Sequence, residues 1–447
     1  MRVLVLHGLV HASRVTTLQH TLSFSRHLNG CEVTYVHGLG LVGGDAVKGN
    51  FDLAIVTYEL AGLRNTPFWK VVRDRIRPLL ERSRIRVLMP QDDYSSCAYL
   101  DDFAVECEFN FVFTPLTRDL HMLYPRATAQ GITFHEAFTG YWEESTSLPI
   151  GDFRIPFEER SVDLGQRVRH LPPQLGPAAQ RKGELAIRFA AQASDAGFTC
   201  DVSTRDSDVL IGSDWWKFLG NTKFTVGRLG GASIADPRGR LAAKVRQLQL
   251  RKPNITYGEI AVRLKTASLP QGDFTAISPR LFECAAMGVC QILERAHYFN
   301  DFEPWREYIP LDPNMSNLDE VFNVMRDQDQ CREIASQAEK SLITSGRFTY
   351  RQFIRRLAME TLGHDIDSHG PPTVVDADSV LFGTMSADEV EHTKTAARRN
   401  IIFGRWATVG DWHEEAAVWT EGFRDGSLVV ESLTLPWCPA LTHFDKS

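Results

Sequence analysis

Residues 277–311 read ISPRLFECAAMGVCQILERAHYFNDFEPWREYIPL, and this stretch indicates the fold class. It opens as a loop and continues as a predicted helix, Arg280 to Met287, which Gly288 ends. The apolar run Val289 to Leu293 follows at once and predicts a buried strand. A short helix that feeds directly into a buried strand is typical of α/β folds.

The same alternation of apolar strands and helices runs through most of the chain and predicts doubly wound parallel sheets. The predicted strands are Arg2–His7, Cys31–Val36, Phe51–Thr57, Arg84–Met89, Phe109–Phe113, Ser161–Val168, Thr199–Ser203 and Lys223–Val226. A Pro- and Gly-containing loop near residue 150 predicts a domain boundary. We therefore expect an N-terminal domain at 1–150, a second domain at 151–362, and a linker with a C-terminal extension of unknown role at 363–447.

Composition narrows the class of protein. The 447 residues carry a formal charge of −7, which gives no overall electrostatic footprint for nucleic acid or an anionic membrane, although a local basic groove stays open. The eight Cys are dispersed without a CxxC pair, which indicates reduced thiols and argues against a zinc site. No apolar run is long enough to span a bilayer and no signal peptide is visible. We expect a cytoplasmic protein.

The predicted helix that starts at Arg280 has features of a ligand site. Backbone N–H groups at a helix start attract anions, and the helix dipole adds to that attraction. Glu283 lies one turn into the helix, where its carboxylate could reach a ligand hydroxyl, and Arg280 lies on the same face. The alternative is an ordinary buried α/β unit in which Glu283 caps a helix or forms a salt bridge.

This stretch resembles the donor-binding segment of GT-B glycosyltransferases, in which a Phe-Glu-Ala-x-Ala-x-Gly-like helix presents its Glu to the ribose of a nucleotide-sugar. Phe282, Glu283, Ala286 and Gly288 match that pattern. The wider string resembles a bacterial family 1/4-like (CgeB-like) group of glycosyltransferases, with Ser-Pro-Arg-x-Phe-Glu, Gln-Ile-Leu-Glu and Tyr-Ile-Pro-Leu pieces in order. Thr275 stands where many retaining members carry a second Glu, so the resemblance does not imply retention of anomeric configuration.

The resemblance implies two Rossmann-like domains facing a cleft, with a nucleotide-diphosphate-sugar bound by the second domain and an acceptor by the first. The acceptor class (glycan, lipid-linked glycan, protein or small molecule) stays open, as do the sugar and the base. Neither a metal nor another cofactor is implied. The alternatives are a nucleotide-sugar epimerase or a sugar phosphorylase on the same scaffold, or an inactive scaffold module. The C-terminal extension lies outside the resemblance and could contact an acceptor or form a homodimer interface.

Cations after the first strand of the second domain are candidates for binding the diphosphate. Arg167 and Arg169 match an Asp-x-Gly-Tyr-Arg-x-Arg-x-x-Pro segment of the resembled group, with Gln166 in place of the Tyr, and Lys182 follows after a Gly-Pro loop. Their charge would stabilise a developing diphosphate through paired hydrogen bonds. Solvated surface cations are the alternative.

A glycine-rich segment is a second candidate for the phosphates or the base. Gly230 and Ser233 belong to a predicted loop, residues 227–233, whose backbone amides could approach an anion. Asp236 completes the resembled Gly-x-x-x-Gly-Ala-Ser-x-x-Asp pattern. A plain turn is the alternative.

A proton acceptor is expected where the strands of the first domain end, because ligands of such sheets bind beyond the carboxyl ends of the strands. Asp92 and Asp93 follow the fourth strand, and a pair of carboxylates raises the pKa of one member. Helix capping or a salt bridge is the alternative for both. His7, and His11 in the loop after it, are further candidates, although a single His is more often structural.

Overall fold

The computed structural model describes residues 1–8, 15–38, 47–66, 68–143, 150–210, 212–363 and 365. Contacts divide the chain into two compact α/β units. Unit 1 comprises Met1–Ala137, Ile234–Gly272 and the chain from Leu357 onward; unit 2 comprises Phe138–Ser233 and Asp273–Arg356.

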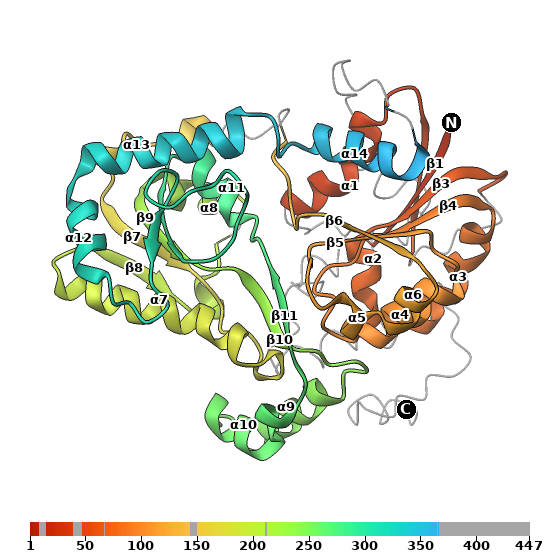
Figure 1. Cartoon of the computed structure of the whole chain (residues 1–447), viewed down its shortest axis with the longest axis horizontal. Helices are drawn as coiled ribbons and strands as arrows, with labels where there is room; N and C mark the ends of the chain where they lie inside the picture. Colours follow the sequence, from red (N-terminus) through yellow and green to blue (C-terminus); the bar gives the residue numbers. More distant parts are fainter. Residues whose placement is uncertain are drawn as a thin grey trace, which may run out of the picture. The chain divides into compact units, whose positions relative to one another are not determined.

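Unit 1 is built on a six-stranded parallel sheet with the strand order β2-β1-β3-β4-β5-β6 (Figure 1). Its strands are β1 (Arg2–His7), β2 (Glu32–His37), β3 (Phe51–Val56), β4 (Ser83–Leu88), β5 (Phe111–Thr114) and β6 (Thr133–Glu136). The apolar run from Val3 to Leu6 in β1 is fully buried, as expected for a strand covered on both faces. Since β1 lies between β2 and β3, the chain reverses its direction of travel across the sheet at β1 and β3, which makes their carboxyl ends the topological switch point.

The helices of unit 1 include α1 (Val15–His27), α2 (Tyr58–Gly62), α3 (Trp69–Glu81), α4 (Cys97–Glu106), α5 (Leu120–Leu123), α6 (Pro125–Ala129), α9 (Arg240–Arg251) and α10 (Tyr257–Leu264). They connect these strands, except α9 and α10, which belong to the segment Ile234–Gly272. The sequence predicts one helix from Asn65 to Glu81, whereas a regular helix begins only at Trp69. Asn65 instead ends a single 3-10 turn, Leu63–Asn65, which follows the short helix α2.

Unit 2 contains a five-stranded parallel sheet with the order β13-β12-β9-β7-β8. Its strands are β7 (Val162–Arg167), β8 (Cys200–Ser203), β9 (Thr222–Gly227), β12 (Cys290–Glu294) and β13 (Ile309–Leu311). Its helices are α7 (Pro177–Asp195), α8 (Ser213–Gly220), α11 (Arg280–Ala286), α12 (Leu318–Arg326) and α13 (Gln328–Glu339), and α14 (Tyr350–Leu362) leads back to unit 1. The two parallel sheets confirm the predicted α/β class with two Rossmann-like domains.

The predicted helix at 280–287 and the strand after it are confirmed as α11 and β12. Gly288 ends the helix with φ +61°, and a Cβ there would lie 2.5 Å from the Arg154 guanidinium. Arg160, which is buried, donates to the carbonyls of Met287 at 2.8 Å and Gly288 at 3.1 Å. These contacts fix the end of α11, because buried carbonyls need hydrogen-bond partners.

The segment 227–233, predicted as a loop, is instead largely a strand. β10 (Gly230–Ile234) pairs with β11 (Gln271–Ala276) in a two-stranded sheet. Gly231 has φ +126°, and a Cβ at this position would lie 2.1 Å from the Phe274 carbonyl oxygen. The close approach of the two strands therefore explains why residue 231 is a glycine.

The contact-based division differs from the predicted domain boundaries in two respects. Unit 1 ends its first segment at Ala137 and takes up the inserted segment Ile234–Gly272, which carries α9 and α10. The predicted C-terminal extension lies outside the described residues, apart from positions 363 and 365. None of the described helices is long and apolar enough to cross a membrane.

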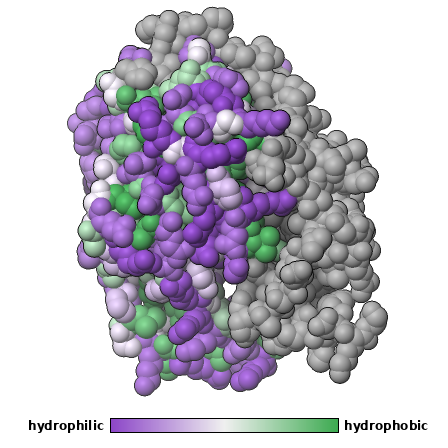
Figure 2. All heavy atoms as spheres, turned by 90° about the vertical axis from the view of Figure 1, so that its right-hand side faces the viewer, coloured by the Kyte–Doolittle hydropathy of each residue, from purple (hydrophilic) through white to green (hydrophobic). Residues whose placement is uncertain are grey.

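One face of the molecule can be followed in Figure 2. Hydrophilic side chains predominate among its coloured residues, and the hydrophobic side chains between them form small, separate groups. Scattered apolar side chains of this kind are normal for a protein surface.

Candidate functional site

Glu283 lies in the first turn of α11, as the sequence predicts, and is half-buried. Leu281 and Phe282 pack into the core on the other side of the helix and are 5% and 3% exposed. The indole Nε1 of Trp215 donates to Glu283 Oε2 at 3.0 Å. Trp215 comes from α8, and its indole fixes the orientation of the carboxylate.

Arg280 is bound by the end of β7. Its guanidinium donates to Gln166 Oε1 at 2.7 Å and to the Arg167 carbonyl at 2.6 Å. It also lies over the ring of Trp215, 5.2 Å from the centroid. Arg280 therefore positions the start of α11 against the carboxyl end of β7.

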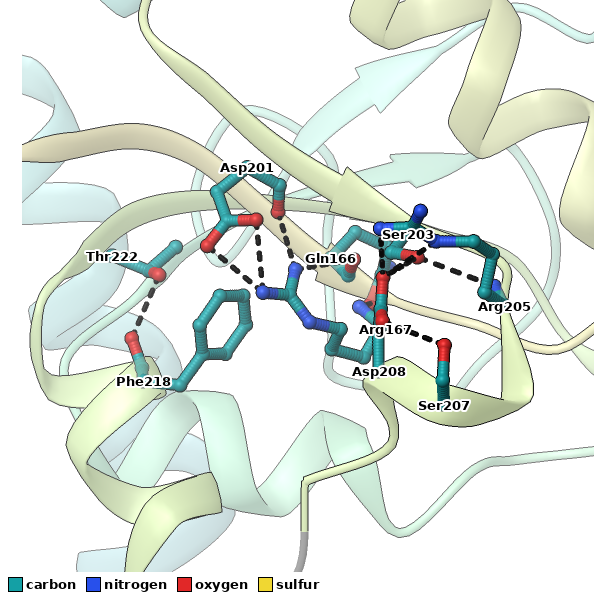
Figure 3. Close-up of polar contacts among 9 residues, drawn as sticks. All are labelled: Gln166, Arg167, Asp201, Ser203, Arg205, Ser207, Asp208, Phe218 and Thr222. Carbon is teal, nitrogen blue, oxygen red and sulfur yellow. Dashed lines mark hydrogen bonds and ion pairs between the residues drawn. The ribbon is translucent and has the colours of Figure 1, made fainter.

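Arg167 is occupied by a carboxylate of its own unit (Figure 3). Its guanidinium donates to the Asp201 carboxylate at 2.8 and 2.9 Å and to the Asp201 carbonyl at 2.8 Å. It also lies over the ring of Phe218, 4.3 Å from the centroid. These contacts use both terminal nitrogens of the guanidinium and favour a structural role.

The N-terminus of α7 brings together several predicted donor-binding residues. A Cβ on Gly230 would lie 3.3 Å from Lys182 Nζ, so the ammonium group lies against the backbone of β10. The Ala178 N–H in the first turn donates to Ser233 Oγ at 3.4 Å. The first turn holds no acidic residue, so the positive end of this 19-residue helix is not neutralised by its own side chains.

Two further arginines at this helix end were missed by sequence reasoning. Arg228 donates to Glu294 Oε1 at 2.9 Å and to the Ala178 carbonyl at 2.6 Å. Arg181 donates to the other oxygen, Glu294 Oε2, at 2.9 Å. With Lys182 these side chains bring three positive charges to this helix end, and Glu294 binds two of them. The neighbouring Arg169 is half-buried just beyond β7.

The carboxyl edge of the unit 1 sheet carries buried acids instead. Asp93 has no exposed surface, and its Oδ2 accepts from the hydroxyls of Thr114 at 2.7 Å and Tyr124 at 2.6 Å. Burial raises the pKa of Asp93, with a smaller contribution from Asp92. The direction is that predicted for a carboxylate pair, but its main cause is desolvation.

Asp92 is held in a strained loop. Its backbone φ is +52°, its carboxylate accepts from the Tyr94 hydroxyl at 2.6 Å, and its carbonyl accepts from Arg64 at 2.7 Å. His7 is fully buried at the end of β1, and its ring lies edge-on to that of His37, with 5.1 Å between the ring centroids. His11 lies outside the described residues.

Glu59 is an acid at the switch point that sequence reasoning missed. It lies in the first turn of α2, directly after β3, and is 8% exposed. Its Oε1 accepts from the Thr21 hydroxyl at 2.9 Å, and Oε2 has no hydrogen-bond partner within the usual distance among the described residues. Burial raises the pKa of Glu59 to about 7, opposed by weaker interactions with nearby hydroxyls. A carboxyl with this pKa can exchange a proton near neutral pH.

A Cβ on Gly8 would lie 3.3 Å from the Glu59 carbonyl oxygen, so β1 and α2 approach closely at this point. The signal available in the sequence was an acid two residues beyond a buried strand, in Thr57-Tyr58-Glu59. No group of three or more His, Cys, Asp or Glu in the described part of the chain is arranged to hold a metal ion.

The comparisons with known proteins give low similarities. No protein-family model and no curated protein matches the sequence. HepE of Anabaena in complex with UDP and glucose matches with 12% identity and a TM-score of 0.42, over 80% of this chain and 100% of that chain. An alpha-glucosyltransferase in complex with UDP matches with 10% identity and a TM-score of 0.44, over 80% and 99%.

Sucrose-phosphate synthase from Thermosynechococcus elongatus matches with 12% identity and a TM-score of 0.41, over 81% of this chain and 100% of that chain. At these levels of identity and superposition the likeness assigns no function by itself. In this chain, unit 2 contains a helix terminus surrounded by cations and the bound carboxylate of Glu283. Unit 1 contains buried acids.

Proposed function

We propose that the protein is a glycosyltransferase of the GT-B type, which moves a sugar, expected to be a hexose, from a nucleotide-diphosphate-sugar to an acceptor. The observation that carries the proposal is the N-terminus of α7 with Lys182, Arg181 and Arg228 around it. A helix start with backbone N–H groups and excess cations suits a diphosphate. Solved structures at low similarity were obtained with UDP, which makes UDP the first probe to use.

In this proposal the groups of unit 2 bind the donor. Lys182 and the first turn of α7 neutralise the charge that develops on the leaving diphosphate, which lowers the barrier more than it stabilises the bound donor. Glu283 accepts hydrogen bonds from the ribose hydroxyls, with Trp215 fixing its orientation. Arg280, Gly230 and Ser233 position these elements, and Arg169 is a further candidate for phosphate.

Unit 1 would bind the acceptor and take its proton. Glu59 is the best-placed base, because it lies at the switch point of the sheet and its pKa is raised by burial to about 7. Asp92, Asp93 and His7 stay proposals for this role. All three of Glu59, Asp93 and His7 are buried, and Glu59 is preferred for its place directly after β3 and its pKa of about 7.

Calorimetry with nucleotides tests the donor site. Binding of UDP, GDP and ADP to the full chain is measured first, and then binding of the 2′,3′-dideoxy form of the best ligand. If Glu283 binds the ribose, loss of both hydroxyls weakens binding to the wild type by about ten-fold or more, as expected for hydrogen bonds to a charged group.

The variant Glu283→Ala should bind the two ligands equally. Glu184→Ala, an exposed acid on α7, is the matched control and should keep the wild-type preference. If Glu283→Ala retains the full preference for the ribose hydroxyls, the assignment of Glu283 is wrong. If none of the nucleoside diphosphates binds, the proposed function is wrong, and an inactive scaffold is favoured.

The enzymatic alternatives differ in their products. An epimerase changes the sugar while it stays attached to the nucleotide, and a phosphorylase consumes phosphate. A transferase requires an acceptor or releases free sugar slowly to water. Product analysis with a labelled donor, with and without phosphate, separates the three.

A further inference from the structure

The inserted segment of unit 1 carries a charge opposite to that of the whole chain. Residues 234–272 contain eight Lys or Arg and two Asp or Glu, so their formal charge is +6, whereas the full chain carries −7. Most of these residues lie on α9 and α10 or in the connection between them. A local field of this size persists despite the negative total, because screening limits electrostatic influence to about 8–10 Å at physiological ionic strength.

The segment is firmly joined to the rest of unit 1. Asp236, which is 5% exposed, accepts through its carboxylate from the N–H groups of Leu241 at 3.2 Å and Ala242 at 2.8 Å, at the start of α9. Its own N–H donates to the Tyr94 carbonyl at 2.8 Å. Arg238 forms an ion pair with Asp102 at 2.8 Å. The orientation of α9 on unit 1 is therefore fixed by buried and charged contacts.

α9 and α10 pack on each other through a small apolar core. Val245, Ile255 and Ile260 are 2%, 8% and 1% exposed, and Leu248 and Leu264 pack against them. This packing determines which face of each helix is turned outward.

One exposed side of α9 carries a stripe of cations. Arg240, Lys244 and Arg251 are exposed and fall within about 40° of one another on a helical wheel, with Val245 about 100–140° away. Arg238 and Lys252 of this segment form ion pairs, whereas Arg240, Lys244 and Arg251 form none within the described residues. The three cations of the stripe are therefore not paired with a carboxylate of unit 1.

Apolar side chains are exposed on the same two helices. Leu250 on α9 is 56% exposed and Val262 on α10 is 78% exposed. They are two of the five large hydrophobic side chains exposed in the described part of the chain. Exposed apolar side chains combined with Lys and Arg on short helices are typical of segments that bind at a membrane interface.

We propose that α9 and α10 form a docking surface for an anionic phospholipid bilayer. The cations would bind the lipid phosphates, and Leu250 and Val262 would insert at the boundary of the acyl chains. Nucleic acid would match the cations, but its phosphate backbone would leave the two apolar side chains exposed. The surface is separate from the residues assigned to the nucleotide-sugar, so the proposal does not rest on the proposed function.

Sedimentation with vesicles tests this surface on the full chain. We expect binding to vesicles of phosphatidylcholine mixed equally with phosphatidylglycerol, no binding to phosphatidylcholine alone, and weaker binding at higher salt. Each basic residue near an anionic surface contributes a factor of about five. The triple variant Arg240→Gln, Lys244→Gln, Arg251→Gln should therefore lose about 100-fold in partitioning.

The control triple variant replaces three exposed basic residues elsewhere in unit 1, Lys48→Gln, Lys70→Gln and Arg84→Gln, and should lose much less. The double variant Leu250→Ser, Val262→Ser should lose about ten-fold while it keeps the preference for anionic vesicles. Circular dichroism and thermal unfolding establish that each variant folds.

Equal loss in the two triple variants, or binding to neutral vesicles, would overturn the proposal. So would a lack of binding to anionic vesicles together with salt-dependent binding to a DNA duplex, which would assign the surface to nucleic acid.

Discussion

The carboxyl edges of the two parallel sheets carry different ionisable groups. In unit 2, the elements that follow β7 and β9 supply Lys182, Arg181, Arg228 and the N-terminus of α7, with Glu294 as the acid among them. In unit 1, the corresponding edge holds the buried carboxyls Glu59 and Asp93, whose pKa values are raised by burial.

The same architecture therefore presents a cationic edge and a proton-exchanging edge. The proposed glycosyl transfer would use both environments, because a diphosphate leaving group requires positive charge and an acceptor hydroxyl requires a proton acceptor. Substitutions at each edge test whether the named residues determine its stability, its raised pKa values or its affinity for nucleotides.

The largest effect is expected for Arg64, which organises the acidic edge. This 2%-exposed guanidinium donates to four carbonyls: Ser95 at 2.8 Å, Ala61 at 3.1 Å, Gln91 at 2.9 Å and Asp92 at 2.7 Å. Arg64→Met removes these donors, and we expect a loss of about 3–5 kcal/mol in the free energy of unfolding. Urea unfolding followed by circular dichroism measures it.

The control for this prediction is Arg84→Met, on an exposed arginine of β4, which should change the stability by less than about 0.5 kcal/mol. If Arg64→Met also changes the stability by less than about 0.5 kcal/mol, the loop of Asp92 does not depend on Arg64.

The second effect concerns Glu59 and depends on pH. Its pKa is about 7 in the folded protein and about 4.5 when unfolded, so the folded state prefers the protonated form. The stability that this provides is present at acid pH and is lost as pH rises to 7. Relative to Glu59→Gln, the wild type should lose about 2–3 kcal/mol between pH 5 and pH 8. Urea unfolding of both proteins at the two pH values gives the difference.

His20 contributes with the opposite sign in the same unit. Burial lowers the pKa of His20 to about 3, so its contribution is lost as pH falls below 6.5. For this reason the comparison uses the difference between wild type and Glu59→Gln, in which the contribution of His20 cancels. If the free energies of unfolding of wild type and Glu59→Gln change equally with pH, the pKa of Glu59 is not raised in the folded protein.

The smallest effect is expected for Arg167, and it tests whether this cation belongs to the phosphate-binding group. Because its guanidinium is bound by Asp201 and packs on Phe218, Arg167→Ala should change the affinity for UDP by less than about three-fold. A loss of ten-fold or more, measured by calorimetry on a folded variant, would restore Arg167 as a phosphate-binding residue.

The sequence predicts the elements better than their partners. Buried strands such as β1 and β9, and the helix end at Gly288, follow from apolar runs and local backbone preference. α4 was missed, and so was strand β10, because its glycine segment has the composition of a loop and is ordered by pairing with β11.

The candidate site shows the same limit. The sequence placed Lys182 and Gly230 in one site, and they lie together. It could not tell that Asp201 would bind Arg167, that Trp215 would bind Glu283, or that burial would change Glu59, because these contacts join residues far apart in the chain.

The most direct test of the cationic edge is calorimetry of Lys182→Gln with UDP, UMP and uridine. Lys182→Gln should bind UDP about ten-fold or more weakly than the wild type does, because a charge-assisted hydrogen bond contributes about 1.5–3 kcal/mol. Its affinity for UMP should fall by less, and its affinity for uridine should not change. Equal affinity of wild type and variant for UDP, or equal weakening for all three ligands, would contradict this prediction.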